Sequence, residues 1–300
     1  MSLRVGIDLG GTKTEAIAID DDGNELLRRR VATIAGDYGA TLATVKHLVV
    51  GIEQSLGGHA TVGVGIPGSI SPASGLVKNA NSTWLIGRPF DRDLGALLER
   101  PVRLANDADC FALSEASDGA AAGLPVVFGV ILGTGVGGGI VVNGKLLGGP
   151  NAIAGEWGHN PLPWPTDSER PGPPCYCGRS GCIETFLSGP GLGRDDGRAR
   201  DAAAIAAAGD PAAEASLARY EERLARALAQ VINILDPHAV VLGGGLSKLQ
   251  RLYANVPPMW ERWVFSDTVR TLLLPPRHGD SSGVRGAAWL WSAAEARALG

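Results

Sequence analysis

The feature that most constrains the fold is a structural unit that the sequence contains twice. An apolar run, a glycine-threonine turn and a second apolar run fill residues 3–20, and the same order returns in residues 126–142. Apolar alternation on both sides of a short turn predicts two antiparallel strands. Helical periodicity in residues 39–56, with apolar positions three and four apart, lies between the two copies. The chain is therefore expected to be an α/β protein with two similar lobes.

The first glycine turn does not match the dinucleotide-binding fingerprint. That fingerprint requires a helix directly after the glycines, whereas here residues 21–24 form a turn and residues 25–33 read as another strand. The turn can still offer backbone N–H groups and the Thr12 hydroxyl to phosphates, and Asp8 can hold Mg²⁺ through water. A tight hairpin with a glycine bulge explains this segment equally well by itself. The second turn, at residues 133–139, favours a nucleotide bound between two lobes.

Polar residues follow two further strands. Asn106-Asp107-Ala108-Asp109 comes after a strand at residues 102–105 and before a helix expected at 110–119. A carboxylate at the carboxyl end of such a strand is where an α/β protein places a general base. A third glycine run, 243–245, follows a strand at 239–242 and would suit an adenosine group. A final helix at 283–291 is expected to pack on the first lobe.

One histidine and three cysteines have the spacing of a metal site. His159 is followed, after a proline-rich loop at 160–174, by Cys175, Cys177 and Cys182. Three of the four cysteines thus lie within eight residues, and a Cys3His set is typical of structural zinc. The alternative is three incidental thiols beside a core histidine. Glu156 and Glu184 flank the ligands, so we expect the metal to brace a site that uses these acids and to order the loop at 160–174.

Composition limits the partners. The 300 residues are 45% hydrophobic and carry a formal net charge of −4, which offers no basic surface for nucleic acid or anionic membrane. No apolar run approaches the roughly 20 residues of a membrane span, and no leader pattern precedes the first strand. The sequence therefore predicts a cytoplasmic protein with a small-molecule ligand. Asn79, Asn81 and Trp84 fit either a sugar pocket or ordinary turn geometry.

Taken together, these motifs resemble the ROK family of sugar kinases and repressors over essentially the whole chain. The resemblance rests on Asp8-Leu-Gly-Gly-Thr-Lys, Asn106-Asp107, Gly133-Thr-Gly, Gly155-Glu-x-Gly-His159, Cys-x-Cys-Gly-x-x-Gly-Cys-x-Glu184 and Gly243-Gly-Gly. It implies the actin-like ATPase fold, two ribonuclease-H-like lobes with a nucleotide and sugar cleft between them. The residues of several motifs are most similar to those of bacterial fructokinases of the manno-fructokinase type.

The resemblance also implies roles for matching positions. Asp107 matches the general base, and the sugar-binding positions are Asn81, Asn106, Asp107, Glu156, His159 and Glu184. The ATP-binding positions are Asp8, Gly10, Gly11, Thr12, Lys13, Gly133, Thr134, Gly135, Gly243, Gly244 and Gly245, and the zinc ligands are His159, Cys175, Cys177 and Cys182. ATP, Mg²⁺ and structural Zn²⁺ are the implied cofactors, and a homodimer is the implied assembly. The expected lobes are residues 1–118, completed by a helix at about 284–298, and residues 119–283 with the zinc motif at 159–182.

The activity expected from this resemblance is ATP-dependent phosphorylation of D-fructose to fructose 6-phosphate, with mannose next. A kinase for glucose or an N-acetylated hexose such as N-acetylglucosamine is the alternative within the family. Two other classes share the fold. A ROK-type sugar-sensing regulator is expected to carry a helix-turn-helix before the first strand, which here begins at Leu3. A nucleotide-switched actin-like protein has no use for Asn106-Asp107 beside the Glu156, His159 and Glu184 cluster.

Overall fold

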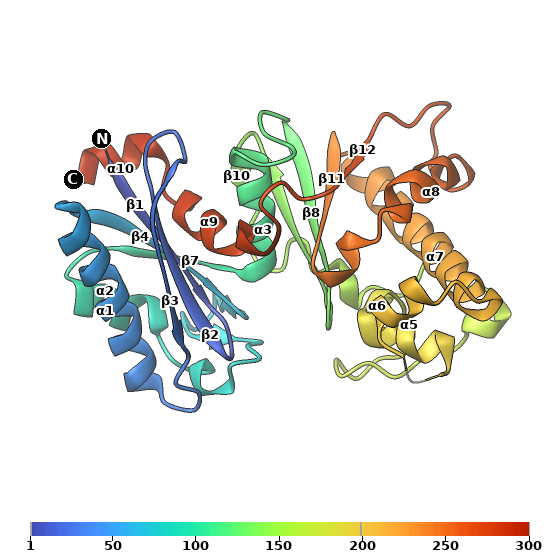
Figure 1. Cartoon of the computed structure of the whole chain (residues 1–300), viewed down its shortest axis with the longest axis horizontal. Helices are drawn as coiled ribbons and strands as arrows, with labels where there is room; N and C mark the ends of the chain where they lie inside the picture. Colours follow the sequence, from blue (N-terminus) through green and yellow to red (C-terminus); the bar gives the residue numbers. More distant parts are fainter. Residues whose placement is uncertain (1, 199, 300) are drawn as a thin grey trace.

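The computed structural model describes residues 2–198 and 200–299, and its two main sheets share one strand plan (Figure 1). The first sheet has the order β3 (Glu25–Ala32), β2 (Lys13–Ile19), β1 (Leu3–Leu9), β4 (Ala60–Ile66), β7 (Val102–Asn106). The second has the order β10 (Lys145–Leu146), β9 (Val136–Val142), β8 (Val126–Leu132), β11 (Ala239–Gly243), β12 (Leu272–Leu274). In each, three antiparallel strands continue into two parallel ones. The repeat seen in the sequence thus extends to whole sheets.

Helices cover both faces of each sheet (Figure 1). The α-helices are α1 (Tyr38–Leu56), α2 (Phe90–Leu98), α3 (Asp107–Ser117), α4 (Ile183–Leu187), α5 (Gly189–Asp196), α6 (Ala202–Ala208), α7 (Pro211–Leu235), α8 (Arg251–Met259), α9 (Ser282–Trp289) and α10 (Ala293–Leu299). Short 3-10 helices are η1 (Thr83–Leu85), η2 (Trp157–His159), η3 (Asp167–Glu169), η4 (Gly245–Lys248), η5 (Trp260–Arg262) and η6 (Gly279–Ser281), and β5 (Ser69–Ile70) pairs with β6 (Val77–Lys78). Helices α3 and α9 lie between the two sheets.

The outer helices form where the sequence predicts them. Helix α1 buries Val45, Leu48, Val49 and Ile52 against the first sheet, which is the stripe expected from the periodicity of residues 39–56. Helix α7 begins with an Asp210 cap and a proline in its first turn, and it buries an apolar stripe against the second sheet. No helix of the described residues is both long enough and apolar enough to cross a membrane.

The two central helices approach their neighbours closely because glycines leave room. A Cβ atom on Gly286 of α9 would lie 1.6 Å from the backbone oxygen of Cys110 in α3. On the other side of α9, a Cβ on Gly6 of β1 or Gly63 of β4 would come within 2.1 or 1.9 Å of α9 carbonyl oxygens. Backbone therefore packs directly on backbone at these three points. Cys110 is fully buried at the crossing, as expected for a small hydrophobic residue.

Three element boundaries differ from the sequence prediction. Helix α3 begins at Asp107 rather than Cys110, because the Asn106 side chain caps it. Strand β9 begins at Val136, so the glycines at 137–139 belong to the strand and not to the turn. The expected final helix ends at Trp289 and is followed by α10, and both pack against β1 and β4. The proposed lobe division at residue 118 stays a prediction.

The α3–α9 crossing predicts an unusually sensitive glycine. We expect Gly286→Ala to lower the free energy of unfolding by about 3 kcal/mol or more, because neither backbone can move away from the new methyl group. Thermal unfolding followed by circular dichroism measures the effect. Gly283→Ala is the matched control in the same helix: its Cβ would lie 3.7 Å from the Asp8 carboxylate, an ordinary contact, and Tm should stay equal or rise. Equal Tm values for both variants would contradict the packing argument.

Candidate active site

A cleft of about 800 Å³ brings together most of the residues singled out from the sequence. All six expected sugar-binding residues line it: Asn81, Asn106, Asp107, Glu156, His159 and Glu184. The second glycine turn, Gly133, Thr134 and Gly135, lines it too. Among the described residues, the lining does not include Asp8, Gly10, Gly11, Thr12, Lys13, Gly243, Gly244 or Gly245. The residues predicted to bind sugar and one of the turns predicted to bind ATP therefore share a cavity, while the other two glycine runs do not line it.

Asn106 and Asp107 occupy the junction between β7 and α3. The Asn106 side chain accepts a hydrogen bond from the Asp109 backbone N–H at 2.5 Å, so it fixes the start of the helix as well as facing the cleft. Asp107 is the first helical residue, and its carboxylate accepts from the Ala108 N–H at 2.8 Å while remaining open to the cleft. Burial within the cleft walls raises the pKa of Asp107, which these backbone hydrogen bonds partly offset.

Acidic groups concentrate around Asp107. Burial, the Glu156 charge and the Asp107 charge raise the pKa of Asp109 to about 7. Burial, Asp107 and Glu15 raise the pKa of Asp8 at the end of β1 to about 6. Asp109 therefore lies in the first turn of α3 and also belongs to a group of mutually repelling carboxyls. Such a group favours a protonated carboxyl or a nearby cation.

The segment carrying Glu156 and His159 is held flat against β9. Gly155 has a positive φ of 89°, and a Cβ there would meet the Gly138 oxygen at 2.4 Å. The buried Trp157 ring donates from Nε1 to the Gly137 oxygen at 3.0 Å and packs edge-on against a phenylalanine of β8. The glycines of this motif and of β9 thus serve close backbone packing. That packing turns Glu156 and His159 toward the cleft.

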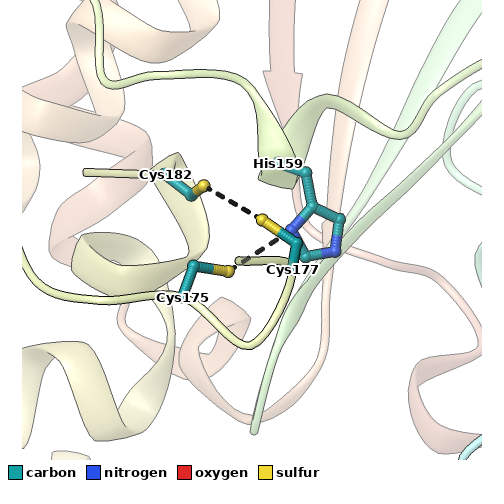
Figure 2. A group of neighbouring side chains, drawn as sticks. All are labelled: His159, Cys175, Cys177 and Cys182. Carbon is teal, nitrogen blue, oxygen red and sulfur yellow. Dashed lines mark hydrogen bonds between the residues drawn. The ribbon is translucent and has the colours of Figure 1, made fainter. Parts of the chain in front are cut away.

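The four expected zinc ligands form one cluster (Figure 2). The donor atoms of His159, Cys175, Cys177 and Cys182 all lie within 4.8 Å of one another. The Cys175 Sγ to His159 Nδ1 distance is 3.6 Å, and the Cys177 Sγ to Cys182 Sγ distance is also 3.6 Å. A tetrahedron with Zn–S bonds of about 2.3 Å and Zn–N bonds of about 2.0 Å would place its ligand atoms roughly 3.5–3.8 Å apart. The residues present therefore fit a structural zinc ion.

Glu184 connects this cluster to the second glycine turn. Its carboxylate accepts from the Val136 N–H at 3.0 Å, and the same oxygen would lie 2.6 Å from a Cβ on Gly135. The Gly189 N–H also donates to the Gly133 oxygen at 2.8 Å. The segment after the cysteines and the turn at residues 133–135 therefore share hydrogen bonds, so a shift in one moves the other.

The proline-rich loop at 160–174 has an anchor that the sequence analysis missed. Glu169 in this loop is buried and pairs with Arg226 at 2.8 Å and with Arg223 at 2.7 Å, both from α7. Burial by itself would raise the pKa of Glu169, but hydrogen bonds from Arg226 and Arg223 outweigh it and lower the pKa to about 2. The loop therefore has a support that does not depend on the expected metal. Arg223 and Arg226, two arginines on the buried face of α7, were the sequence feature that could have predicted a buried acidic partner.

The remaining glycine runs lie near the same edges of the sheets. In the first turn, the Gly10 N–H donates to the Lys13 oxygen at 3.1 Å, and the Thr33 hydroxyl donates to the Gly10 oxygen at 2.8 Å. In the third run, a Cβ on Gly244 would meet the Leu132 oxygen at 2.4 Å, directly before the second turn. Trp84 packs with the first lobe's core and donates to the Thr41 hydroxyl, so the structure supports the turn interpretation for this ring.

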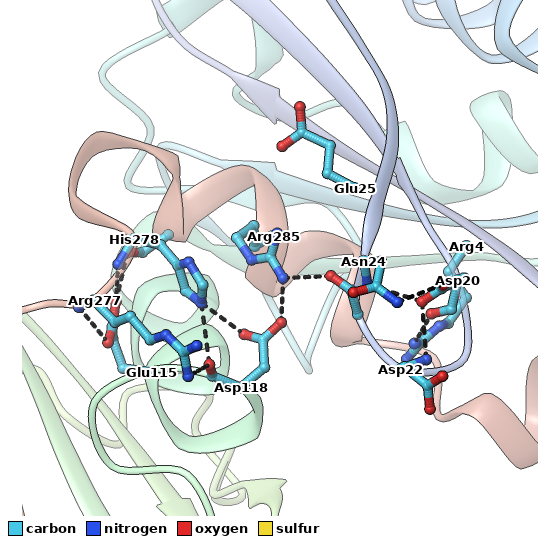
Figure 3. Close-up of polar contacts among 12 residues, drawn as sticks. Arg4, Asp20, Asp22, Asn24, Glu25, Glu115, Asp118, Arg277, His278 and Arg285 are labelled. Atoms are coloured by element: carbon cyan, nitrogen blue, oxygen red, sulfur yellow. Dashed lines mark hydrogen bonds and ion pairs between the residues drawn. The ribbon is translucent and has the colours of Figure 1, made fainter.

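The chain passes from the first sheet to the second through α3 and returns through residues 277–289, and polar contacts join these two segments (Figure 3). Glu115 of α3 is fully buried and accepts from the Ser282 hydroxyl at 2.7 Å and the Arg277 N–H at 3.0 Å. Asp118, just after α3, pairs with Arg285 of α9 and with the His278 ring. These bonds tie the outgoing and the returning chain to each other, and so fix the two walls of the cleft.

Comparison with known proteins identifies the family. Residues 4–294 match the model of the ROK family. The chain is 40% identical over 300 residues to the N-acetyl-D-glucosamine kinase of Yersinia pseudotuberculosis (serotype O:3, strain YPIII), covering 95% of this chain and 97% of the relative. It is also 40% identical to the N-acetyl-D-glucosamine kinase of Escherichia coli (serotype O9:H4, strain HS), covering 95% and 98%. The protein belongs to the ROK family.

Solved structures agree with this assignment. The crystal structure of the ROK hexokinase from Thermus thermophilus superimposes with a TM-score of 0.85 at 30% identity, covering 96% of this chain and 97% of that one. The ROK glucokinase from Streptomyces griseus, solved with glucose and AMPPNP, superimposes with a TM-score of 0.76 at 28% identity. The match covers 96% of this chain and 98% of the glucokinase. The expected actin-like ATPase fold is confirmed. The fructokinase type is not supported, since the similar relatives named here have other substrates.

The cluster of Figure 2 predicts one zinc per chain. Cys182→Ala should lose the metal, measured by elemental analysis, because three remaining ligands hold zinc less tightly. Since Glu169 anchors the loop at 160–174 independently, limited proteolysis should show cleavage near the cysteines before cleavage near Glu169. The reverse order of cleavage is expected for Glu169→Gln, which keeps all four ligands. Fully active parent protein without zinc would contradict the assignment.

Proposed function

We propose that this protein is an ATP-dependent kinase that phosphorylates a hexose, with N-acetylglucosamine as the preferred substrate. The observation that carries the proposal is 40% identity, over 95% of the chain, to enzymes named N-acetyl-D-glucosamine kinases. The cleft supports it, because it combines a general-base candidate, polar sugar ligands and a glycine turn in one cavity. D-Fructose, which the motif residues suggested, is not supported by the names of these relatives.

Asp107 is the proposed general base. Its carboxylate faces the cleft from the first turn of α3, and its raised pKa makes it a better proton acceptor near neutral pH than an ordinary aspartate. It would take the proton of the attacking sugar hydroxyl. Asn81, Glu156 and Glu184 supply amide and carboxylate groups that suit sugar hydroxyls, and Asn106 holds the start of the helix that carries Asp107.

The glycine turns are the proposed ATP contacts. Gly133–Gly135 line the cleft, where a glycine turn can present backbone N–H groups to phosphate, while Gly10–Lys13 and Gly243–Gly245 follow the carboxyl ends of β1 and β11. Asp8, whose pKa burial raises to about 6, is the carboxylate at the end of β1 that would orient Mg²⁺ through water. Mg²⁺ bound with ATP neutralises the phosphate charge. The proposed zinc positions His159 and Glu184 rather than reacting.

The substrate proposal predicts the order of a hexose panel. In a coupled ADP-release assay with ATP and Mg²⁺, N-acetylglucosamine should give the highest kcat/KM among N-acetylglucosamine, N-acetylmannosamine, glucose, mannose and fructose. A reaction without sugar is the control, and it should release little ADP. A higher kcat/KM for fructose or glucose would overturn the substrate but leave the kinase proposal standing. Sugar-independent ATP turnover would instead favour a nucleotide-switched protein.

The base assignment predicts a large kinetic effect of one small substitution. Asp107→Asn keeps the shape but cannot accept the proton, so kcat should fall by about 10² to 10⁴. Because the lost interaction is made mainly in the transition state, kcat and kcat/KM should fall together while KM for the sugar changes little. Steady-state kinetics with the best hexose of the panel measures both values. A large rise in KM with unchanged kcat would assign Asp107 to binding instead.

Asp109→Asn is the matched control, two residues along the same helix. Its kcat should stay within a few-fold of the parent. The raised pKa of about 7 means that folding disfavours ionised Asp109, so the parent loses stability as pH rises from about 4 to about 7. The asparagine cannot ionise, and the variant should therefore gain more Tm relative to the parent at pH 8 than at pH 5. Abolished turnover in this variant alone would move the catalytic role to Asp109.

A further inference from the structure

Tyr176, between two of the proposed zinc ligands, contacts the histidine that faces the cleft. The Tyr176 hydroxyl lies 2.9 Å from His159 Nε2, and the two rings meet edge to face with centroids 5.1 Å apart. The side chain is nevertheless 84% exposed, and it lines the same cavity as the sugar residues. An aromatic ring with so much exposed surface has little packing to keep it in place. Its hydrogen bond to His159 is the contact that does so.

The protonation of the His159 ring decides which atom donates the hydrogen bond to the other. The Nδ1 atom lies on the cysteine side, 3.6 Å from Cys175 Sγ, and a zinc ion would take its lone pair. The neutral imidazole then carries its proton on Nε2, which donates to the Tyr176 oxygen. The second ring nitrogen of His159 is therefore not free. The tyrosine accepts the hydrogen bond that would otherwise be available to a sugar oxygen in the cleft.

We propose that Tyr176 gates the sugar site by competing with the substrate for the N–H group of His159. This inference rests on the proposed sugar kinase function, and it gives Tyr176, the residue between Cys175 and Cys177, a role in setting sugar affinity. Cys175 and Cys177 hold the backbone on both sides of Tyr176, so opening the gate needs only a rotation of its side chain. In the closed position the tyrosine satisfies His159. In the open position the sugar oxygen replaces it.

Gating and direct sugar contact predict opposite changes in affinity. Tyr176→Phe keeps the ring and removes the competing hydroxyl. If the hydroxyl competes, KM and Kd for N-acetylglucosamine should fall by about two- to tenfold, the equivalent of one net hydrogen bond. The value of kcat and the KM for ATP should change little. If the hydroxyl binds the sugar instead, the same variant should raise KM and Kd, which would overturn the gate.

The experiment combines calorimetric titration of the sugar with steady-state kinetics on zinc-replete protein. Tyr38→Phe is the matched control, because it removes a hydroxyl that bonds Asp93 at 2.7 Å in the first lobe, and it should leave both constants unchanged. Equal zinc content in all three proteins verifies that the cluster of His159, Cys175, Cys177 and Cys182 is intact. Tighter binding without phosphorylation would refute the kinase proposal and retain the gate. Phosphorylation with unchanged Kd and KM would refute the gate alone, and a parent that binds no hexose would refute both.

Discussion

The structure depends on the direct backbone contact between helices α3 and α9. Gly286 meets Cys110 with no space for a side chain, and on the other side of α9 the glycines Gly6 and Gly63 let β1 and β4 approach equally closely. Each helix also covers one face of a different sheet. Because interiors are close-packed, this crossing fixes how the two sheets are placed relative to each other. The cleft at their edges exists only as a result of that placement.

Close packing at glycines also determines which charged groups lie near one another at the site. Gly139 lets β9 approach so near to α3 that a Cβ would lie 2.8 Å from the Asp109 Cα atom. Gly155 similarly brings the segment with Glu156 onto β9. Asp8 of β1, Asp107 and Asp109 of α3, and Glu156 thereby lie near one another, and the pKa values of Asp8, Asp107 and Asp109 are all raised. Polar groups such as Glu115 and Asp118 secure the arrangement at the chain connections.

The metal cluster acts on this cleft through short covalent and hydrogen-bonded links. Glu184 follows Cys182 by two residues and bonds the Val136 N–H, so ligand geometry is transmitted to the second glycine turn. His159 belongs to the cluster and, through Nε2, to the cavity. A structural metal bound here would orient both the residues proposed to bind sugar and the turn proposed to bind phosphate. Tyr176, which is 84% exposed, bonds His159 from the cavity side of this cluster.

The sequence by itself determined the repeated hairpins, the amphipathic helix α1, the capped helix α7 and the cluster of one histidine and three cysteines, because each depends on local period, turn chemistry or donor spacing. It did not determine that Asp109 lies near the Glu156 charge, that Glu169 anchors its loop, or that the Tyr176 hydroxyl bonds His159 Nε2. Each of these depends on a partner brought close by packing rather than by local sequence pattern. The comparisons do not support the predicted preference for fructose, which rested on short motifs shared across the family.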